Sequence, residues 1–259
     1  MAKLLSFFAC AVALLSANSY GDESLADVKQ QVVLLHGLGR SSASMAPLAE
    51  SLQGAGFAVC NVAYPSRRYS IAVLSENFVA PKVSQCFPDE RLPVHFVTHS
   101  LGGIIARQLA SAGLVANFGR VVMLSPPNQG TEVVDKLGRE PLFEVITGPA
   151  GGELGTSAAA LPQRLGPAAF ELGVITGTRS INLLLSMMIP GDDDGKVSVA
   201  RAKLEGMKDF VTVPAAHPFI MKSDVAIKQT LHFLQHGWFI HEFRPLRRAP
   251  QAYFKRVAR

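Results

Sequence analysis

Short runs of β-branched and other apolar residues alternate along this chain with segments in which apolar residues recur at helical spacing. The run Gln31–Leu35 reads Gln-Val-Val-Leu-Leu, whereas Ile104–Leu114 carries its apolar residues on one helical face. Such alternation predicts an α/β fold with a mainly parallel six-stranded sheet and helices on both faces. The expected strands are 31–35, 57–62, 93–98, 119–125, 172–176 and 209–214, and the expected helices are 42–54, 70–86, 101–112 and 224–236.

One long stretch of the chain, 132–166, lacks strong periodicity. It contains the glycine-rich pieces Gly148–Gly152 and Leu154-Gly155. A long irregular stretch inside a compact domain is more often functional than passive. We therefore expect a cap or a pocket wall over 132–170, with a surface loop of little role as the alternative.

Length and composition indicate one domain of ordinary size. The chain has 259 residues, of which 48% are hydrophobic, and its mean hydropathy of +0.23 suits a buried parallel sheet. No internal apolar run approaches the ~20 residues that a membrane span needs. The sequence has no P-loop, dinucleotide fingerprint, zinc-ligand spacing or nucleic-acid-binding motif. We therefore expect no nucleic-acid partner, no cofactor and no metal, and we interpret His232 and His236 as a solvated or hydrogen-bonded pair.

The two ends of the chain differ from the part between them. Residues 1–20 combine Lys3, an apolar stretch over Leu4–Leu15 and small residues near position 18. This pattern is typical of a secretory signal peptide, and an uncleaved N-terminal anchor is the alternative. The remaining domain, 21–243, is then periplasmic or secreted.

The C-terminal tail, 244–259, is basic and carries interleaved aromatic residues. Such a segment can touch an anionic lipid surface, so the sequence allows a peripheral contact with a membrane. A solvated tail is the other interpretation.

Cys60 and Cys86 would both remain in an exported chain. An oxidising compartment favours a disulfide between them. A strand and the helix that follows it run in opposite directions, however, and this places the end of the strand far from the end of the helix. On that argument we predict two unbridged thiols.

The sequence Thr-His-Ser-Leu-Gly, residues 98–102, lies where a strand should end and a helix should begin. A serine at such a corner is typical of a nucleophile elbow, because the tight turn lifts its hydroxyl above the sheet. Gly102 and Gly103 would let strand and helix pass close together. Thr98 stands where the usual pattern has glycine, which is a mild departure.

A second glycine-rich corner, His36–Gly39, follows the strand 31–35. With the elbow, it resembles the bacterial lipase and esterase branch of the α/β-hydrolase family, in which His-Gly-x-Gly supplies half of an oxyanion hole. The resemblance implies that the amides of Leu38 and Leu101 stabilise the negative charge of acyl transfer. A plain strand-to-helix turn is the alternative for this corner alone.

The family orders its catalytic residues as serine, acid, histidine. His217 follows the β-type run Asp209–Pro214 and opens a loop with Pro218, where this fold places its base. The segment Ser125–Thr131 also resembles a lipase motif, but Asn128 replaces the histidine of that motif, so no catalytic role is assigned to it.

The acid is expected in an aspartate cluster that lies between the strand 172–176 and His217. Lipases commonly carry their acid in Asp-Gly-x-Val, and residues 194–197 match this pattern. We therefore choose Asp194, with Asp192 and Asp193 as alternatives.

These residues predict a serine hydrolase that cleaves carboxylic esters, with lipid-like esters as the expected substrates. The expected catalytic residues are Ser100, Asp194 and His217, and the mechanism passes through an acyl-enzyme. The alternatives are a thioesterase, amidase or acyltransferase with the same triad, or a catalytically silent accessory protein.

Overall fold

The computed structural model describes residues 29–138 and 140–241. The predicted signal peptide, 1–20, and the basic tail, 244–259, lie outside the described residues. Six strands form one sheet in the order β2-β1-β3-β4-β5-β6, and every neighbouring pair is parallel. The predicted α/β-hydrolase fold is confirmed. The strands are β1 (Gln31–Leu35), β2 (Ala58–Val62), β3 (Val94–His99), β4 (Phe118–Leu124), β5 (Leu172–Gly177) and β6 (Asp209–Val213).

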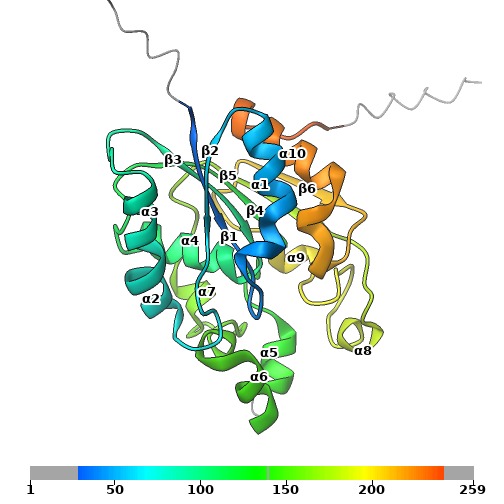
Figure 1. Cartoon of the computed structure of the whole chain (residues 1–259). Coiled ribbons are helices and arrows are strands. Elements are labelled where there is room, and N and C mark those ends of the chain that lie inside the picture. Colours follow the sequence, from blue (N-terminus) through cyan, green and yellow to red (C-terminus); the bar gives the residue numbers. More distant parts are fainter. Residues whose placement is uncertain (1–28, 139, 242–259) are drawn as a thin grey trace, which may run out of the picture.

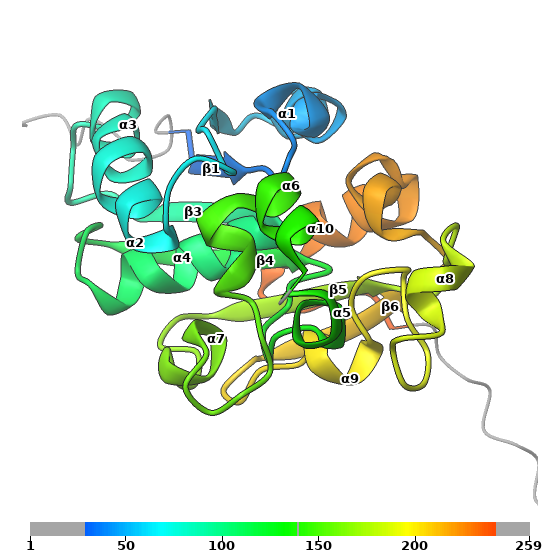
Figure 2. The same ribbon diagram turned by 90° about the horizontal axis from the view of Figure 1, so that it is seen from below.

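Helices cover both faces of this sheet (Figures 1 and 2). On one face lie α1 (Ala46–Gly54) and α10 (Asp224–His236), and on the other lie α2 (Ile71–Leu74), α3 (Ala80–Cys86), α4 (Leu101–Ser111) and α9 (Val199–Ala202). None of the helices within residues 29–138 and 140–241 is both long enough and apolar enough to cross a membrane.

The alternation of side chains along each strand produces two cores. In β1, Val32 and Leu34 pack with α1 and α10, whereas Val33 and Leu35 pack with α2, α3 and α4. All four side chains are fully buried. Burial of both faces explains why the strand is apolar at successive positions rather than at every second one.

The predicted helix 70–86 forms, but it contains an interruption. A π-helical turn, Ser75–Val79, separates α2 from α3. Pro81 has no N–H to donate to the carbonyl group of Asn77, and its ring crowds that carbonyl in an α-helix. A widened turn just before the proline accommodates both effects.

The stretch that showed no clear periodicity forms three short helices, α5 (Glu132–Leu137), α6 (Pro141–Gly152) and α7 (Leu161–Arg164). Helix α6 is kinked at Gly148, where φ is +65°, and a Cβ atom there would lie 1.8 Å from the Arg67 carbonyl oxygen. Only glycine allows this approach. In Figure 1, α5 and α6 lie below the sheet.

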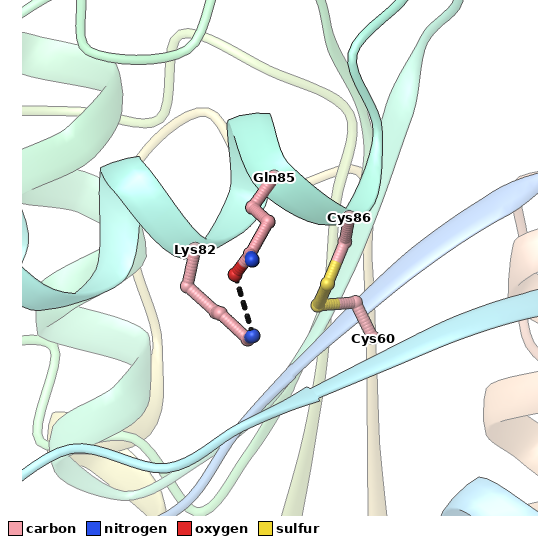
Figure 3. Close-up of a disulfide and its surroundings, with 4 residues drawn as sticks. All are labelled: Cys60, Lys82, Gln85 and Cys86. Carbon is pink, nitrogen blue, oxygen red and sulfur yellow. Dashed lines mark hydrogen bonds between the residues drawn. A yellow bond between two sulfur atoms is a disulfide. The ribbon is translucent and has the colours of Figure 1, made fainter.

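Cys60 and Cys86 form a disulfide, so the prediction of two unbridged thiols was wrong (Figure 3). The prediction treated Cys60 as the end of its strand, but Cys60 is the third of the five residues of β2. Helix α3 folds back along the sheet until its last residue, Cys86, lies beside that midpoint, with 6.1 Å between the two Cα atoms. This distance lies within the usual range for a disulfide.

We expect Cys60 and Cys86 to resist alkylation in the oxidised protein until a reductant is added. The intact mass should then increase by two alkyl groups. Because the bridge closes a loop with a sequence separation of 26 residues, the double variant C60S/C86S should lower the free energy of unfolding by roughly 3–4 kcal/mol. Alkylation of both thiols without reductant would contradict this prediction.

Candidate active site

Ser100 occupies a strained corner between β3 and α4. Its φ is +52° and its ψ is −119°, a conformation that non-glycine residues rarely adopt. The strain is maintained because the Ser100 N–H donates to the Leu124 carbonyl at 2.9 Å and the Ser100 carbonyl accepts from the Gly103 N–H at 2.9 Å. The hydroxyl is thus fixed at the carboxyl edge of the sheet.

The corner depends on glycine at position 102. A Cβ atom on Gly102 would lie 2.5 Å from the carbonyl oxygen of Leu35, the last residue of β1. Thr98 does not obstruct the turn, because its fully buried side chain lies beside Gly103, whose Cβ would approach the Thr98 hydroxyl to only 3.4 Å. The glycine that this turn requires therefore follows the serine rather than preceding it.

Ser100, His217 and Asp194, which are far apart in the sequence, form one hydrogen-bonded chain. Asp194 Oδ2 lies 2.8 Å from His217 Nδ1, and His217 Nε2 lies 3.0 Å from Ser100 Oγ. Because an ionised carboxylate can only accept, Nδ1 carries the ring proton and Nε2 can accept from the Ser100 hydroxyl. His217 begins a 3₁₀ helix, η4 (His217–Lys222), directly after the loop that follows β6.

The structure distinguishes the three adjacent aspartates. Asp194 is fully buried, and its Oδ1 accepts from the backbone N–H groups of Lys196 at 3.1 Å and Val197 at 3.0 Å. Asp193 instead accepts from the Ser186 hydroxyl at 2.7 Å, while Asp192 is exposed. Of the three, Asp194 alone reaches His217.

Burial by itself would raise the pKa of Asp194, but attraction to His217 and hydrogen bonds outweigh it, so that the pKa is lowered. The carboxylate is therefore ionised at neutral pH. Because its pKa in the folded chain lies below the unfolded value of about 3.9, this group stabilises the fold above that pH. The contribution is lost as the pH falls through the folded pKa.

Ser125 is a site residue that the sequence analysis did not single out. It follows β4, is fully buried, and has a φ of +49°, so it shares with Ser100 the rare positive-φ conformation. Its hydroxyl accepts from the Gly177 N–H at 3.4 Å and is among the groups that lower the pKa of Asp194. The resemblance of the segment 125–131 to a lipase motif was the available signal, but it drew attention to Asn128.

Replacing Ser125 with alanine should reduce kcat on the order of tenfold for a reaction in which His217, oriented by Asp194, accepts the proton of Ser100, because a hydrogen bond to a charged group is lost. The fold should persist, since alanine adds no bulk. Steady-state kinetics would be compared with Ser84→Ala, an exposed serine on α3. An unchanged kcat would show that the hydroxyl does not support the carboxylate.

The loop after β1 holds Leu38 at the cavity wall beside Ser100. The buried ring of His36 donates from Nδ1 to the Gly37 carbonyl at 2.9 Å, accepts at Nε2 from the Tyr64 N–H at 3.4 Å, and stacks on the Tyr64 ring. Burial lowers the pKa of His36, in keeping with a neutral ring. Within the described residues the Leu38 N–H donates no hydrogen bond, and the N–H of Leu101 has no acceptor inside its own helix because it is the first residue of α4.

His99, the last residue of β3, is hydrogen-bonded to the backbone of His217. Its Nε2 lies 3.0 Å from the His217 carbonyl oxygen, so Nε2 carries the proton and donates. Burial, followed by repulsion from His217, lowers the pKa of His99 well below its usual value, and the ring is neutral. A Cβ atom on Gly37 would lie 2.7 Å from His99 Nδ1, which explains the first glycine of the loop.

Ser100 and His217 open into a cavity of about 370 Å³. Helices α5 and α6 supply an apolar wall that includes Val134, Leu137, Phe143 and Ile146. A largely apolar cavity of this size with a few polar groups at one point is typical of a small-molecule site. The stretch expected to form a cap or pocket wall thus contributes to the lining.

Within residues 29–138 and 140–241, no group of three or more His, Cys, Asp or Glu side chains is arranged to hold a metal. The rings of His232 and His236 pack against each other, with centroids 4.4 Å apart, and His232 Nδ1 lies 2.8 Å from the Trp238 carbonyl oxygen. His232 is therefore hydrogen-bonded to the backbone, and His236 is exposed beside it.

Comparison with known proteins agrees with this architecture. The family model described as "Alpha/beta hydrolase family" matches residues 32–255. The chain belongs to the α/β-hydrolase family. No curated protein is significantly similar to this α/β-hydrolase in sequence.

Solved structures of lipases and esterases share the fold. The mature form of the Bacillus licheniformis lipase BlEst2 has a TM-score of 0.63 at 19% identity, over 82% of this chain and 93% of the lipase. Aspergillus fumigatus lipase B has a TM-score of 0.59 at 15% identity, over 80% of this chain and 53% of that protein. The phospholipase PlaB from Legionella pneumophila has a TM-score of 0.57 at 15% identity, over 79% of this α/β-hydrolase and 57% of PlaB.

Proposed function

We propose that this α/β-hydrolase cleaves carboxylic esters by a serine mechanism. The observation that carries the proposal is the hydrogen-bonded chain from buried Asp194 through His217 to Ser100, at the inner end of an apolar cavity. A nucleophile, a base within hydrogen-bonding distance and an orienting acid are the three parts that acyl transfer needs. The names of the structural neighbours, which include lipases and a carboxyl esterase, agree with ester chemistry.

In the proposed reaction, Ser100 Oγ attacks the acyl carbon while His217 Nε2 accepts the hydroxyl proton. The tetrahedral intermediate collapses as His217 returns that proton to the departing alcohol, which leaves an acyl-serine. A water molecule then attacks the acyl group while His217 accepts a proton from it. His217 returns this proton to Ser100 Oγ, and the carboxylic acid is released. Asp194 keeps the ring in the required tautomer and stabilises its cationic form.

The negative charge on the carbonyl oxygen needs two donors. We assign this role to the N–H groups of Leu38 and Leu101. The Leu101 group lies at the N-terminus of α4, where the helix dipole also favours an anion. The rigid packing of His36 against Tyr64 would hold the Leu38 group in place before substrate binds, which is the arrangement that stabilises a transition state most strongly.

The surroundings of the cavity favour lipid-like esters. Ile146 of α6 and Leu185 of α8 (Leu183–Ser186) line the cavity. On the same two helices, apolar side chains point into solvent, namely Leu142, Val145, Leu183 and Leu184. Exposed apolar side chains on helices that also line the cavity fit a substrate that arrives from a lipid surface.

We further propose that the enzyme acts outside the cytoplasm, in the periplasm or after secretion. Two features support this: the signal-peptide pattern of residues 1–20 and the Cys60–Cys86 disulfide, a bond that persists in oxidising compartments. The basic tail, 244–259, would add a peripheral contact with anionic lipid.

A fluorophosphonate probe tests the proposed chemistry. The wild-type protein and Ser84→Ala should incorporate one probe molecule at Ser100, whereas Ser100→Ala should incorporate none. Folded wild-type protein that stays unlabelled would support a catalytically silent protein instead. Matched esters, thioesters and amides of increasing acyl length would then identify the bond and the chain length that give the highest kcat/KM.

A further inference from the structure

Two cations face the cavity that contains Ser100. Among the described residues that line it, Arg40 and Lys196 are the only ones with permanently charged side chains, and both are positive. Arg40 follows the loop that holds Leu38, and Lys196 follows Asp194 by two positions. Both side chains reach solvent at the mouth of the cavity.

Neither cation has an acidic partner within residues 29–138 and 140–241. Most carboxylates on the nearby segments have partners of their own: Asp194 binds His217, Glu132 pairs with Arg201, Asp135 accepts from Thr156, Glu153 accepts from the Ile71 N–H, and Asp193 accepts from Ser186 and Gly195. Asp192 is exposed and forms no ion pair with either cation among the described residues. Two like charges that line one cavity, neither of them held in an ion pair among the described residues, attract an anion from solution.

The two cations also influence each other. Partial loss of hydration, and then repulsion from Arg40, lower the pKa of Lys196, while attraction to Asp194 opposes them. A bound anion would relieve this repulsion.

The position of Arg40 indicates which part of a substrate would meet these charges. Its guanidinium donates to the Pro218 carbonyl at 3.3 Å, directly beside His217. In the proposed mechanism His217 protonates the departing alcohol, so the alcohol portion of the ester lies next to Arg40. The acyl chain then extends along the apolar wall of α5 and α6.

We propose that Arg40 and Lys196 bind an anionic group on the alcohol portion of the ester, so that the preferred substrates are acyl esters of anionic alcohols. This inference rests on the proposed esterase function and specifies its substrate class. Hydrolysis of such an ester by water yields the fatty acid and the free anionic alcohol. Phosphate and carboxylate share the required chemistry, and an acylated glycerol phosphate combines an acyl chain with such an anion.

The test compares three octanoyl esters at concentrations where each is monomeric: octanoylglycerol, octanoylglycerol phosphate and octanoylglycerate. The wild-type ratio of kcat/KM for an anionic ester to that for the neutral ester should exceed roughly tenfold and should fall with added salt. A preference for both anionic esters would indicate recognition by charge, and a preference for the phosphate ester alone would indicate recognition of phosphate. Both results support the proposal.

Variants at the two positions connect this ratio to the cations. Arg40→Gln and Lys196→Gln should each lower the ratio by several-fold to tenfold, since each removes one close charge. Arg40→Lys and Lys196→Arg should largely retain it because the charge stays. The matched control is Lys82→Gln, which removes a positive charge from α3 (Figure 3). Lys82 does not line the cavity.

A wild-type ratio near one, or a ratio that Arg40→Gln and Lys196→Gln leave unchanged, would overturn the inference while turnover of octanoylglycerol still upheld the esterase. If no ester were hydrolysed and the fluorophosphonate probe failed to label Ser100, both the function and the inference would be rejected. The two failures are therefore distinguishable.

Discussion

Replacing Ser100 with alanine should lower kcat for ester hydrolysis by roughly 10⁴–10⁶-fold, the usual loss when a triad nucleophile is removed. In the proposed mechanism the Ser100 hydroxyl forms the bond to the acyl carbon, and His217 Nε2 lies 3.0 Å from this hydroxyl, close enough to accept its proton. Alanine keeps the Cβ atom and adds no bulk, so the corner between β3 and α4 should survive. Steady-state kinetics on a short soluble ester would measure the loss, and circular dichroism with a melting curve would verify the fold.

The control for this experiment is Ser84→Ala, in which an exposed serine of α3 that does not line the cavity is changed. This variant should keep wild-type kcat. If a folded Ser100→Ala protein retained more than a few per cent of the activity, Ser100 would not be the nucleophile and the proposed mechanism would fail.

The sheet could be predicted because a strand that is buried on both faces appears in the sequence as a short, continuous apolar run. The runs that became β1 and β3 are short, apolar and rich in β-branched residues, and the observed strands begin and end within one residue of their predicted limits. In a parallel sheet all strands end at one edge. Residues that follow different strands, such as Ser100 after β3 and His217 after β6, are therefore expected at the same edge from their positions in the sequence alone.

The disulfide could not be predicted because it depends on a distance along the sheet rather than on element order. The direction of α3 relative to β2 was predicted correctly. Whether Cys86 reaches Cys60 depends on the point along the sheet at which α3 ends. That point is set by the loop after β2 and by the π-helical turn before Pro81. Neither the loop nor the π-helical turn can be recognised from the pattern of hydrophobic residues.

The places of Ser125, Arg40 and Lys196 beside the site depend on tertiary structure, and only the segment of Ser125 gave a signal in the sequence, through its resemblance to a lipase motif. Ser125 influences Asp194 because β4 and β5 are neighbours in the sheet, and that neighbourhood follows from topology. Arg40 and Lys196 line one cavity although they lie far apart in the sequence. The helix α6 was hidden for a different reason: Gly148 and Pro149 interrupt it, and its apolar residues face both the cavity and solvent.

Replacing Asp194 with asparagine should lower kcat by about 10⁴-fold, the size of the effect in a well-studied serine protease. The carboxylate accepts from His217 Nδ1 at 2.8 Å and so leaves Nε2 without a proton, ready to accept from Ser100. An asparagine side chain can donate to Nδ1, which favours the tautomer that carries its proton on Nε2. That tautomer cannot act as the base, although the fold is preserved.

The adjacent aspartates provide matched controls, because Asp192→Asn and Asp193→Asn make the same chemical change within two residues. Asp192 is exposed, so its variant should keep near wild-type kcat. Asp193 accepts from the Ser186 hydroxyl and the Gly195 N–H, so its variant should loosen the acid loop and cost far less activity than Asp194→Asn. Kinetic constants for the three proteins on one ester decide the assignment. Equal and small losses of kcat in all three variants would mean that the acid lies elsewhere. If Asp194 orients His217, its replacement must lower kcat strongly.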